Sequence, residues 1–182
     1  ILGYAKARHI MVIPEVDMPA HSRAARRASA PKMHNPVMDT RPMPRPEFRN
    51  DILAVMNSET LDYAETIISS LQNMYKQADC ELHYFHIGGD EVPVGILTDQ
   101  ERRDFMDSLI VILKRHNLHP VGWEELTPFC RAKDKPMISV WHSYYPLLQQ
   151  LVDSGYPLIQ MREDQLYFDF CYCNHPQEQG TT

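Results

Sequence analysis

The amino-acid sequence predicts an α/β fold, an incomplete (β/α)8 TIM barrel with about five of its strands. Short apolar runs alternate with longer segments whose apolar residues keep helical spacing, a pattern typical of parallel strands joined by right-handed crossovers. The run at residues 10–16 is nearly continuous, as expected for a strand buried on both faces. A doubly wound sheet is the rival fold, but the Gly-rich phosphate turn that usually opens one is absent from the sequence.

Five apolar runs are the predicted strands. The first contains Pro14, which has no N–H for a ladder and is therefore expected near the end of its strand. The connection between the third and fourth runs is short for a full helix, so we expect it to be irregular. The five runs are residues 10–16, 82–87, 119–123, 137–141 and 158–161.

Three helices are predicted between these strands. Residues 58–77 keep apolar positions at helical spacing. A second helix begins at the capping-box pattern that starts with Thr98 and runs to about His116. A third begins near Pro146 and is stopped by Gly155.

Residues 31–50 are different in kind, with five prolines, three arginines and no hydrophobic period. They predict a long loop insertion, and because it follows the end of a strand we expect part of it to wall the active site. Ser22 is predicted to be the N-cap of the Arg/Ala-rich segment that follows it. Residues 1–182 are predicted to be part of a single domain. The start reads as the tail of an amphipathic helix, so we expect a fragment of a larger protein.

The bulk composition excludes several classes of protein. A net charge of −6 argues against nucleic acid or an anionic membrane as the main partner, and no apolar run is long enough to span a bilayer. The cysteines at 80, 130, 171 and 173 form neither a disulfide framework nor a zinc signature. The composition therefore leaves the compartment and the oligomeric state open.

The stretch Tyr84–Glu91 places two adjacent carboxylates, Asp90 and Glu91, at the carboxyl end of a predicted strand, which is the active edge in barrels. On a regular strand they would point to opposite faces. A bend at Gly88 and Gly89 would aim both at one pocket. The alternative is a strand-to-loop turn with two solvated acids.

Acidic and aromatic residues also follow the other predicted strands, and in a barrel all of them gather at one rim. Carboxylates supply a general acid and a charge stabiliser, while aromatic rings supply apolar faces for a sugar, so the pattern predicts a carbohydrate site. His83 and His86 are three apart on a strand and face opposite sides, which argues against zinc. The residues at the rim are Asp17, His21, Asp90, Glu91, Trp123, Glu124, Glu125, Trp141, His142, Tyr167 and Asp169.

Five motifs in this order resemble glycoside hydrolase family 20, the β-N-acetylhexosaminidases, and within it the chitobiase-like branch. A lone Gly-Gly-Asp-Glu would not be specific, but five motifs in the right order are. Ala20 departs from the Gly that many relatives have at that place. The motifs are Pro14–His21, His86–Glu91, Gly122–Glu125, Val140–Trp141 and Tyr167–Asp169.

The resemblance implies that the chain carries the third to seventh strands of a catalytic barrel. It implies hydrolysis of terminal β-linked N-acetylglucosamine or N-acetylgalactosamine from glycans or chitin oligosaccharides, with no cofactor, no metal and an extracytoplasmic location. The implied mechanism is retaining and substrate-assisted, since this family is an exception to the scheme with two catalytic carboxylates. The acetamido oxygen of the substrate attacks the anomeric carbon and forms an oxazolinium intermediate.

Residue roles follow from the same resemblance. Glu91 is expected to be the general acid and later the base, with His21 behind it in a hydrogen-bond relay. Asp90 is expected to orient the acetamido group and to stabilise the positive charge. Tyr167 is expected to donate a hydrogen bond to the acetamido carbonyl oxygen.

The remaining rim residues are expected to bind the sugar. Trp123 and Trp141 would wall the acetamido pocket, although a Trp at the end of a strand is about as often core. Asp169 would hold a sugar hydroxyl. The pair Glu124 and Glu125 is ambiguous, since one can contact the sugar and the other be solvated. The expected substrate-binding residues are Trp123, Trp141, Asp169, His21, Asp17 and Glu125.

The alternative function is a non-catalytic barrel remnant that binds amino sugars, or an inactive fragment. Asp90, Glu91 and Tyr167 together favour catalysis, because a pure binder needs no general acid. A family 18 chitinase would show a spaced Asp-x-Asp-x-Glu on one strand, which this sequence lacks.

Overall fold

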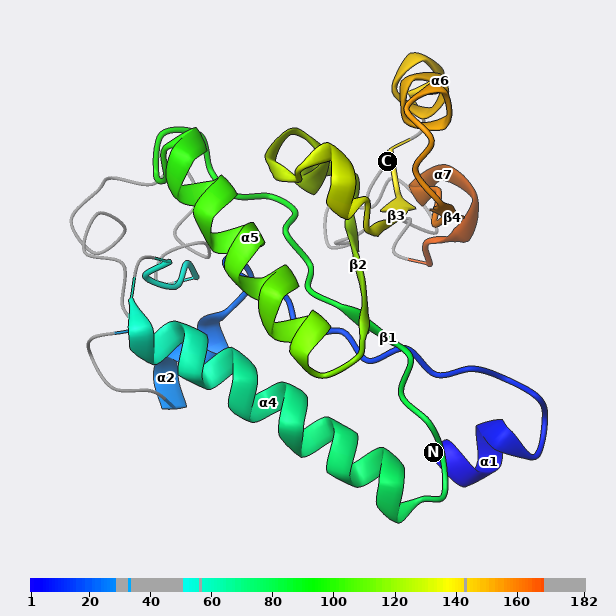
Figure 1. The fold of residues 1–182 in the computed structure, drawn as a ribbon. Helices are drawn as coiled ribbons and strands as arrows, with labels where there is room; N and C mark the ends of the chain where they lie inside the picture. Colours follow the sequence, from blue (N-terminus) through cyan, green and yellow to red (C-terminus); the bar gives the residue numbers. More distant parts are fainter. Residues whose placement is uncertain (29–32, 34–50, 56, 143, 169–182) are drawn as a thin grey trace, which may run out of the picture.

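The computed structural model describes residues 1–28, 33, 51–55, 57–142 and 144–168. Four parallel strands form one sheet in the order β1-β2-β3-β4, so that each strand pairs with the next one along the chain (Figure 1). This order is the one that consecutive strands of a barrel have. The strands are β1 (Tyr84–His86), β2 (His119–Trp123), β3 (Met137–Val140) and β4 (Leu158–Gln160).

The helices in the connections between the strands pack against the sheet. The two long helices, α4 and α5, pack against each other and α5 contacts β2, while α6 lies beside β3 and β4 (Figure 1). The helices are α1 (Leu2–Lys6), α2 (Arg23–Ala28), α4 (Ser58–Gln77), α5 (Asp99–Arg115), α6 (Tyr145–Asp153) and α7 (Glu163–Leu166). None of the helices in these described ranges is long and apolar enough to cross a membrane.

The helix boundaries follow local sequence signals. The side chain of Asn57 accepts a hydrogen bond from the Glu59 N–H and caps α4. Thr98 and Glu101 form the predicted capping box at the start of α5. Ser22 directly precedes α2, as predicted, and its carbonyl oxygen accepts from the Arg26 N–H, but its hydroxyl does not cap the helix and donates to the carbonyl oxygen of Asp17 at 2.9 Å. The Asp51 carboxylate instead accepts from the first backbone N–H of α2.

The predicted strand at residues 10–16 is only partly formed. It is an extended segment with a single bridge, between Glu15 and His86, beside β1. Ile10 and Met11 are 57% and 60% exposed, so the prediction that this run is buried on both sides was wrong for its first half. Pro14 has no N–H to add to the ladder, and only its carbonyl oxygen is used, as acceptor for the His86 N–H.

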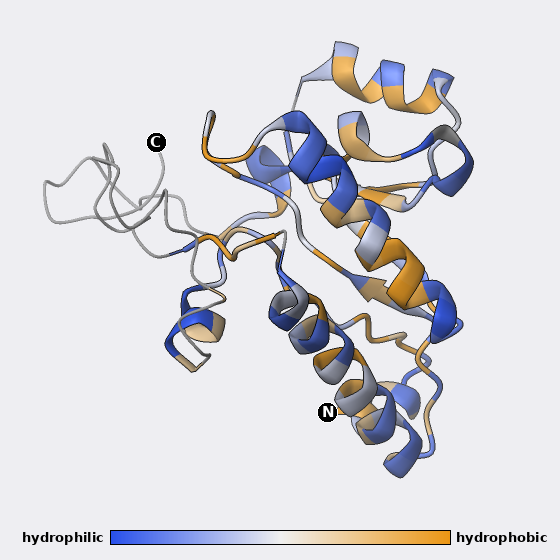
Figure 2. Ribbon diagram, turned by 60° about the vertical axis from the view of Figure 1, so that its left-hand side comes forward, coloured by the Kyte–Doolittle hydropathy of each residue, from blue (hydrophilic) through white to orange (hydrophobic). Residues whose placement is uncertain are grey.

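Most of the core lies between the sheet and the two long helices, where hydrophobic residues gather in Figure 2. Phe85 of β1 and Leu109 of α5 are completely buried there. A smaller cluster of Ile138, Val140 and Leu151 joins β3 to α6. The outer face of the sheet is therefore fixed by packing, which leaves the carboxyl ends of the strands to carry polar groups.

The crossover from β2 to β3 is irregular, as predicted. It consists of two 3-10 helices, η3 (Glu124–Phe129) and η4 (Ala132–Asp134). Within η3, the buried Leu126 lies against Gly122 of β2 and Gly89 of the loop that follows β1. A Cβ on Gly122 would lie 2.0 Å from a methyl carbon of Leu126, and one on Gly89 would also lie 2.0 Å from this side chain. The bare glycines let η3 close over the ends of β1 and β2.

We predict that Gly122→Ala lowers the free energy of unfolding by about 1–3 kcal/mol, because Leu126 has no room to move aside in a packed core. Thermal unfolding measures the loss. Gly3→Ala is the matched control, since a Cβ on Gly3 meets nothing within 4 Å and alanine is favoured in helix α1. Equal unfolding temperatures for both variants would contradict this account of the η3 packing.

Candidate active site

Two loops meet at the carboxyl end of β1. Gly88 and Gly89 have φ angles of +70° and +96°, which turn the chain away from the strand as the sequence predicted. The Gly89 N–H donates a 2.9 Å hydrogen bond to Oδ1 of Asp17 in the neighbouring loop. A Cβ on Gly88 would lie 1.7 Å from the same Oδ1. The glycines therefore admit the Asp17 carboxyl directly against the backbone.

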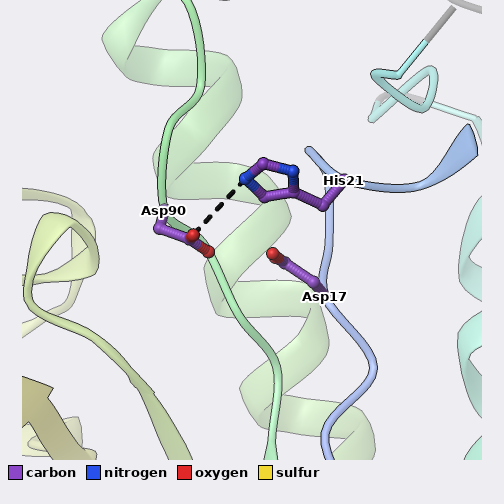
Figure 3. Close-up of side chains that lie close together, drawn as sticks. All are labelled: Asp17, His21 and Asp90. Atoms are coloured by element: carbon purple, nitrogen blue, oxygen red, sulfur yellow. Dashed lines mark ion pairs between the residues drawn. The ribbon is translucent and has the colours of Figure 1, made fainter. Parts of the chain in front are cut away.

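His21 brings both predicted catalytic acids together. Its Nε2 lies 3.4 Å from Oδ2 of Asp90 and 3.2 Å from Oε2 of Glu91. Figure 3 shows Asp17 and His21 facing Asp90 from the neighbouring loop. The Nδ1 atom of His21 lies 3.7 Å from Oδ2 of Asp51, a nearly buried carboxylate that the sequence did not single out. The imidazole is thus surrounded by carboxylates on both of its nitrogen sides.

The backbone is strained at the same place. His21 and Glu91 have φ angles of +50° and +49°, in the left-handed region that residues with a Cβ rarely adopt. Such conformations persist where surrounding contacts hold them, and they cluster at functional sites. Here the strain places the two side chains within hydrogen-bonding distance of each other.

Protons are shared unequally among these groups. Burial raises the pKa of Asp17 to about 9, and a hydrogen bond to Asp90 adds to the effect. The hydrogen bond to Asp90 raises the pKa of His21 to about 9. Burial alone would raise the pKa of Asp90, but hydrogen bonds from His21 and Asp17 outweigh it and hold this pKa below its ordinary value. At neutral pH Asp17 is protonated, His21 is a cation and Asp90 is an anion.

One oxygen of Asp90 stands out by its burial. Oδ1 of Asp90 is fully buried and has no hydrogen-bond partner among the described residues. A proton on Asp17 makes a donor available to the Asp90 carboxylate, with which the Asp17 carboxyl is hydrogen-bonded. The alternative of two solvated acids is wrong for Asp90, whose side chain is 17% exposed, whereas that of Glu91 is 47% exposed.

Trp123 lies at the end of β2, beside this cluster. Its indole N–H donates a 2.9 Å hydrogen bond to Oε1 of Glu15, and its ring meets the His86 ring edge-on at 5.1 Å. His86 is buried, as predicted, with Nε2 3.2 Å from the Ser139 hydroxyl and Nδ1 accepting from the Gly88 N–H. Burial lowers the pKa of His86 to about 4, so this histidine is neutral.

Trp141 follows β3 and is held by both residues of the ambiguous acid pair. Glu124 is buried and accepts hydrogen bonds from the backbone N–H groups of Trp141 and His142 and from the imidazole of His142. Glu125 accepts from the Trp141 indole N–H at 3.2 Å, and burial raises the pKa of Glu125. The expectation that one of the two acids is solvated was wrong, because both point inward to fix Trp141.

Tyr167 and Asp169 follow β4. Tyr167 comes directly after α7 and is 37% exposed, beyond the carboxyl end of the strand, which is the side of the sheet that the sequence predicted. Asp169 lies outside the described residues. Sequence reasoning missed Glu15 as a site residue. The signal for it was its spacing, since Glu15 lies two residues before Asp17 on an extended segment and therefore on the same side.

Among the described residues, two groups of side chains could hold a metal ion, since the ligand atoms within each group all lie within 4.8 Å of one another. Hydrogen bonds account for both. In the first group a proton on Asp17 relieves the repulsion between the Asp17 and Asp90 carboxylates, as a cation would. In the second group the Glu124 carboxylate already accepts three hydrogen bonds. The two groups are Asp17, His21 and Asp90, and Glu124, Glu125 and His142.

Comparison with known sequences identifies relatives. A family model described as glycosyl hydrolase family 20, catalytic domain, matches residues 1–102 and 96–182. Beta-hexosaminidase B of Pseudoalteromonas piscicida is 24% identical over 218 aligned residues, which cover 99% of this chain and 28% of that protein. The N,N'-diacetylchitobiase of Vibrio harveyi is 36% identical over 50% of this chain and 12% of its own length. The chain spans less than a third of the length of these relatives.

Solved structures confirm the fold class, an incomplete (β/α)8 barrel. An exo β-N-acetylglucosaminidase from Vibrio harveyi, solved with N-acetylglucosamine, superposes with a TM-score of 0.80 at 20% identity, over 99% of this chain and 30% of that one. A mutant Streptomyces plicatus β-hexosaminidase, solved with the same product, gives a TM-score of 0.68 at 23% identity, over 98% and 35%.

We predict that Asp17→Asn is tolerated best at high pH. An Asn oxygen can accept from Gly89 and its amide can donate to Asp90, as protonated Asp17 does. Asp17 has an ordinary pKa of 3.8 and a folded pKa of about 9, so between these values the folded state binds more protons than the unfolded state. Its contribution to stability therefore falls as the pH rises across this window.

Thermal unfolding of the variant and the parent between pH 4.5 and about 9 tests this pH dependence. The stability of Asp17→Asn relative to the parent is expected to rise with pH. Asp62→Asn, at an exposed position of α4, is the control and is expected to show no such trend. A constant difference between the Asp17→Asn protein and the parent at all pH values would show that Asp17 carries no proton in the folded state.

Proposed function

Because this chain belongs to glycosyl hydrolase family 20, we propose that the protein hydrolyses terminal β-linked N-acetylglucosamine or N-acetylgalactosamine from glycans or chitin oligosaccharides. The chain matches the catalytic domain of the family, and solved relatives hold N-acetylglucosamine. The proposed mechanism is retaining and substrate-assisted, with the acetamido group of the sugar as nucleophile.

The observation that carries this proposal is the difference between two adjacent acids. Asp90 is mostly buried and kept ionised by donors on both sides, which suits a fixed negative charge. Glu91 has 47% of its side chain exposed and lies 3.2 Å from the His21 imidazole, which suits a group that exchanges protons with a leaving group and with water. A binding site for a neutral sugar has no use for this division.

In the proposed first step, the acetamido oxygen forms a bond to the anomeric carbon while the bond to the leaving oxygen breaks. Glu91 gives its proton to that oxygen, and Asp90 stabilises the positive charge that spreads over the acetamido group. In the second step, a water molecule attacks the anomeric carbon and opens the oxazolinium ring. Glu91 takes the proton of the water and is ready for another cycle.

His21 and Asp17 serve these acids in the proposal. The imidazolium of His21 lies between Asp90 and Glu91 and favours the charged form of Asp90. Asp17 keeps its proton and donates a hydrogen bond to Asp90 rather than binding the sugar itself. This differs from the sugar contact expected from the sequence.

Aromatic residues complete the proposed pocket. Trp123 and Trp141 form walls around the acetamido methyl group, and Glu125 supports the second of them. Tyr167 donates to the acetamido carbonyl oxygen, and Asp169 binds a sugar hydroxyl. A direct contact between Glu125 and the sugar remains a prediction, since its carboxylate can accept further hydrogen bonds beside the indole N–H.

We predict that Glu91→Gln in the full-length protein lowers kcat/KM on a chitin disaccharide about 10²–10⁴-fold, because no proton reaches the poor leaving group. An aryl N-acetyl-β-glucosaminide with a good leaving group needs less protonation and is expected to lose less in the cleavage step. Glu81→Gln, at an exposed site beside His83, is the matched control and should keep full activity. Full activity of Glu91→Gln on the disaccharide would remove Glu91 from its assigned role.

A second prediction tests the acetamido nucleophile. Replacing the N-acetyl group of an aryl substrate by fluoroacetyl and then trifluoroacetyl lowers the nucleophilicity of the carbonyl oxygen, so kcat/KM is expected to fall stepwise. An N-acetylglucosamine-thiazoline is expected to inhibit the enzyme. Tyr167→Phe should lower kcat/KM about tenfold or more, and Tyr145→Phe on the exposed side of α6 is its control. Equal rates for all acyl groups would rule out substrate assistance. Tight sugar binding without any hydrolysis by the parent would favour the binding remnant.

A further inference from the structure

Glu15 is held firmly in place although it lies in a segment that is barely a strand. The backbone around it bonds to β1 on both sides, since the His86 N–H donates to the Pro14 carbonyl and the Val16 N–H donates to the His86 carbonyl. These two bonds are 2.9 and 3.0 Å long. Glu15 therefore points its side chain across β1 from a fixed position, toward β2.

The side chain of Glu15 reaches the indole of Trp123 from there. The Nε1–H group of Trp123 donates to Oε1 of Glu15 at 2.9 Å, a normal length for a hydrogen bond to a carboxylate. The two residues are 108 positions apart in the sequence and lie on either side of β1. An indole has a single polar group, so this bond uses all of its hydrogen-bonding capacity.

His86 supplies the second contact that fixes the ring. Its imidazole meets the Trp123 ring at a centroid distance of 5.1 Å and an angle of 62°. Its Nδ1 lies 3.4 Å from the same Oε1 of Glu15, but it accepts from the Gly88 N–H and is neutral. A hydrogen bond at one edge and a ring contact on another both restrict the two side-chain torsions of the tryptophan.

We propose that Glu15 is a positioning residue for the sugar site, whose carboxylate sets the plane of the Trp123 ring and so the shape of the pocket for the N-acyl group. This inference rests on the proposed function, because that function makes Trp123 a wall of the acetamido pocket. Glu15 does not touch the reacting atoms. It acts through the ring that does touch the substrate, and a small error in that ring misaligns the acetamido oxygen.

The nature of the acceptor distinguishes two substitutions. A Gln at this place keeps an oxygen acceptor for the indole N–H, with a weaker bond because the charge is lost. A Leu has similar bulk and removes the acceptor, which leaves the indole N–H without a partner and the ring free to turn. Glu81→Leu is the matched control, since the Glu81 carboxylate is 84% exposed and pairs only with the solvent-accessible His83 among the described residues.

The test uses the full-length protein with ¹⁵N-labelled tryptophan. The indole N–H resonance of Trp123 is assigned by its loss in Trp123→Phe. In Glu15→Leu this resonance is expected to move upfield, in Glu15→Gln to move little, and in Glu81→Leu to stay in place. Binding of N-acetylglucosamine, measured by titration calorimetry, is expected to weaken about tenfold in Glu15→Leu and less than about threefold in Glu15→Gln.

Kinetics separate positioning from a general loss of structure. For Glu15→Leu we expect kcat/KM on N-acetyl substrates to fall about tenfold while the relative rate on bulkier N-propionyl substrates rises, because the wall has loosened. A partly unfolded protein would lose both substrates equally, and thermal unfolding of Glu15→Gln and Glu15→Leu provides the check on folding.

Three results would overturn the proposal. The first is an unmoved indole resonance in Glu15→Leu, which would show that the bond is absent. The second is a moved resonance with unchanged sugar affinity and acyl preference, which would show that the bond has no role. The third is a parent protein that neither binds nor cleaves N-acetylglucosaminides, which defeats the proposed function together with this inference. A parent that binds the sugar without cleaving it defeats the hydrolase alone, and the affinity loss in Glu15→Leu then still supports Glu15.

Discussion

The site depends on one close approach, that of the Asp17 carboxyl to the backbone of Gly88 and Gly89. The Gly89 N–H donates to this carboxyl, and no side chain fits on Gly88 while it is there. The contact joins the loop after residue 16 to the loop after β1, and with them His21 to Asp90. A Cβ on Gly88 would push the two loops apart, and a Cβ on Gly89 would displace Leu126 of η3 from the end of β1.

The charges follow from this approach. A carboxyl brought so close to Asp90 and out of water keeps its proton, since two buried carboxylates side by side cannot both ionise without a cation between them. The proton settles on Asp17, and Asp90 stays ionised with His21 as its cation. The arrangement places one fixed negative charge in the pocket, whereas Glu91 next to it stays open to solvent. The close approach of the two loops therefore also decides which of the carboxyl groups carries a proton.

Sequence alone predicted the parts that depend on local pattern. Short-range signals predicted three features: the N-cap of α5 at Thr98, the irregular crossover after Trp123 and the glycine bend before Asp90. The first half of the segment at 10–16 was overestimated, because an apolar run does not reveal whether a neighbouring strand covers it. Asp51 was missed for a similar reason, since the local sequence around it does not reveal that it lies beside His21, 30 positions earlier in the chain.

Most of the acids at the rim accept hydrogen bonds that hold other residues in place. A sequence motif does not distinguish these acids from those that would take part in the reaction. Glu15 and Glu125 each accept an indole N–H, and Glu124 accepts two backbone N–H groups and an imidazole. At the carboxyl end of a parallel sheet the chain turns into loops, and donors that no ladder satisfies need acceptors nearby. Carboxylates from the neighbouring element meet that need with the strongest bonds available. Glu91 differs in its exposure, and its proton can therefore leave without removing a hydrogen bond that the walls of the pocket require.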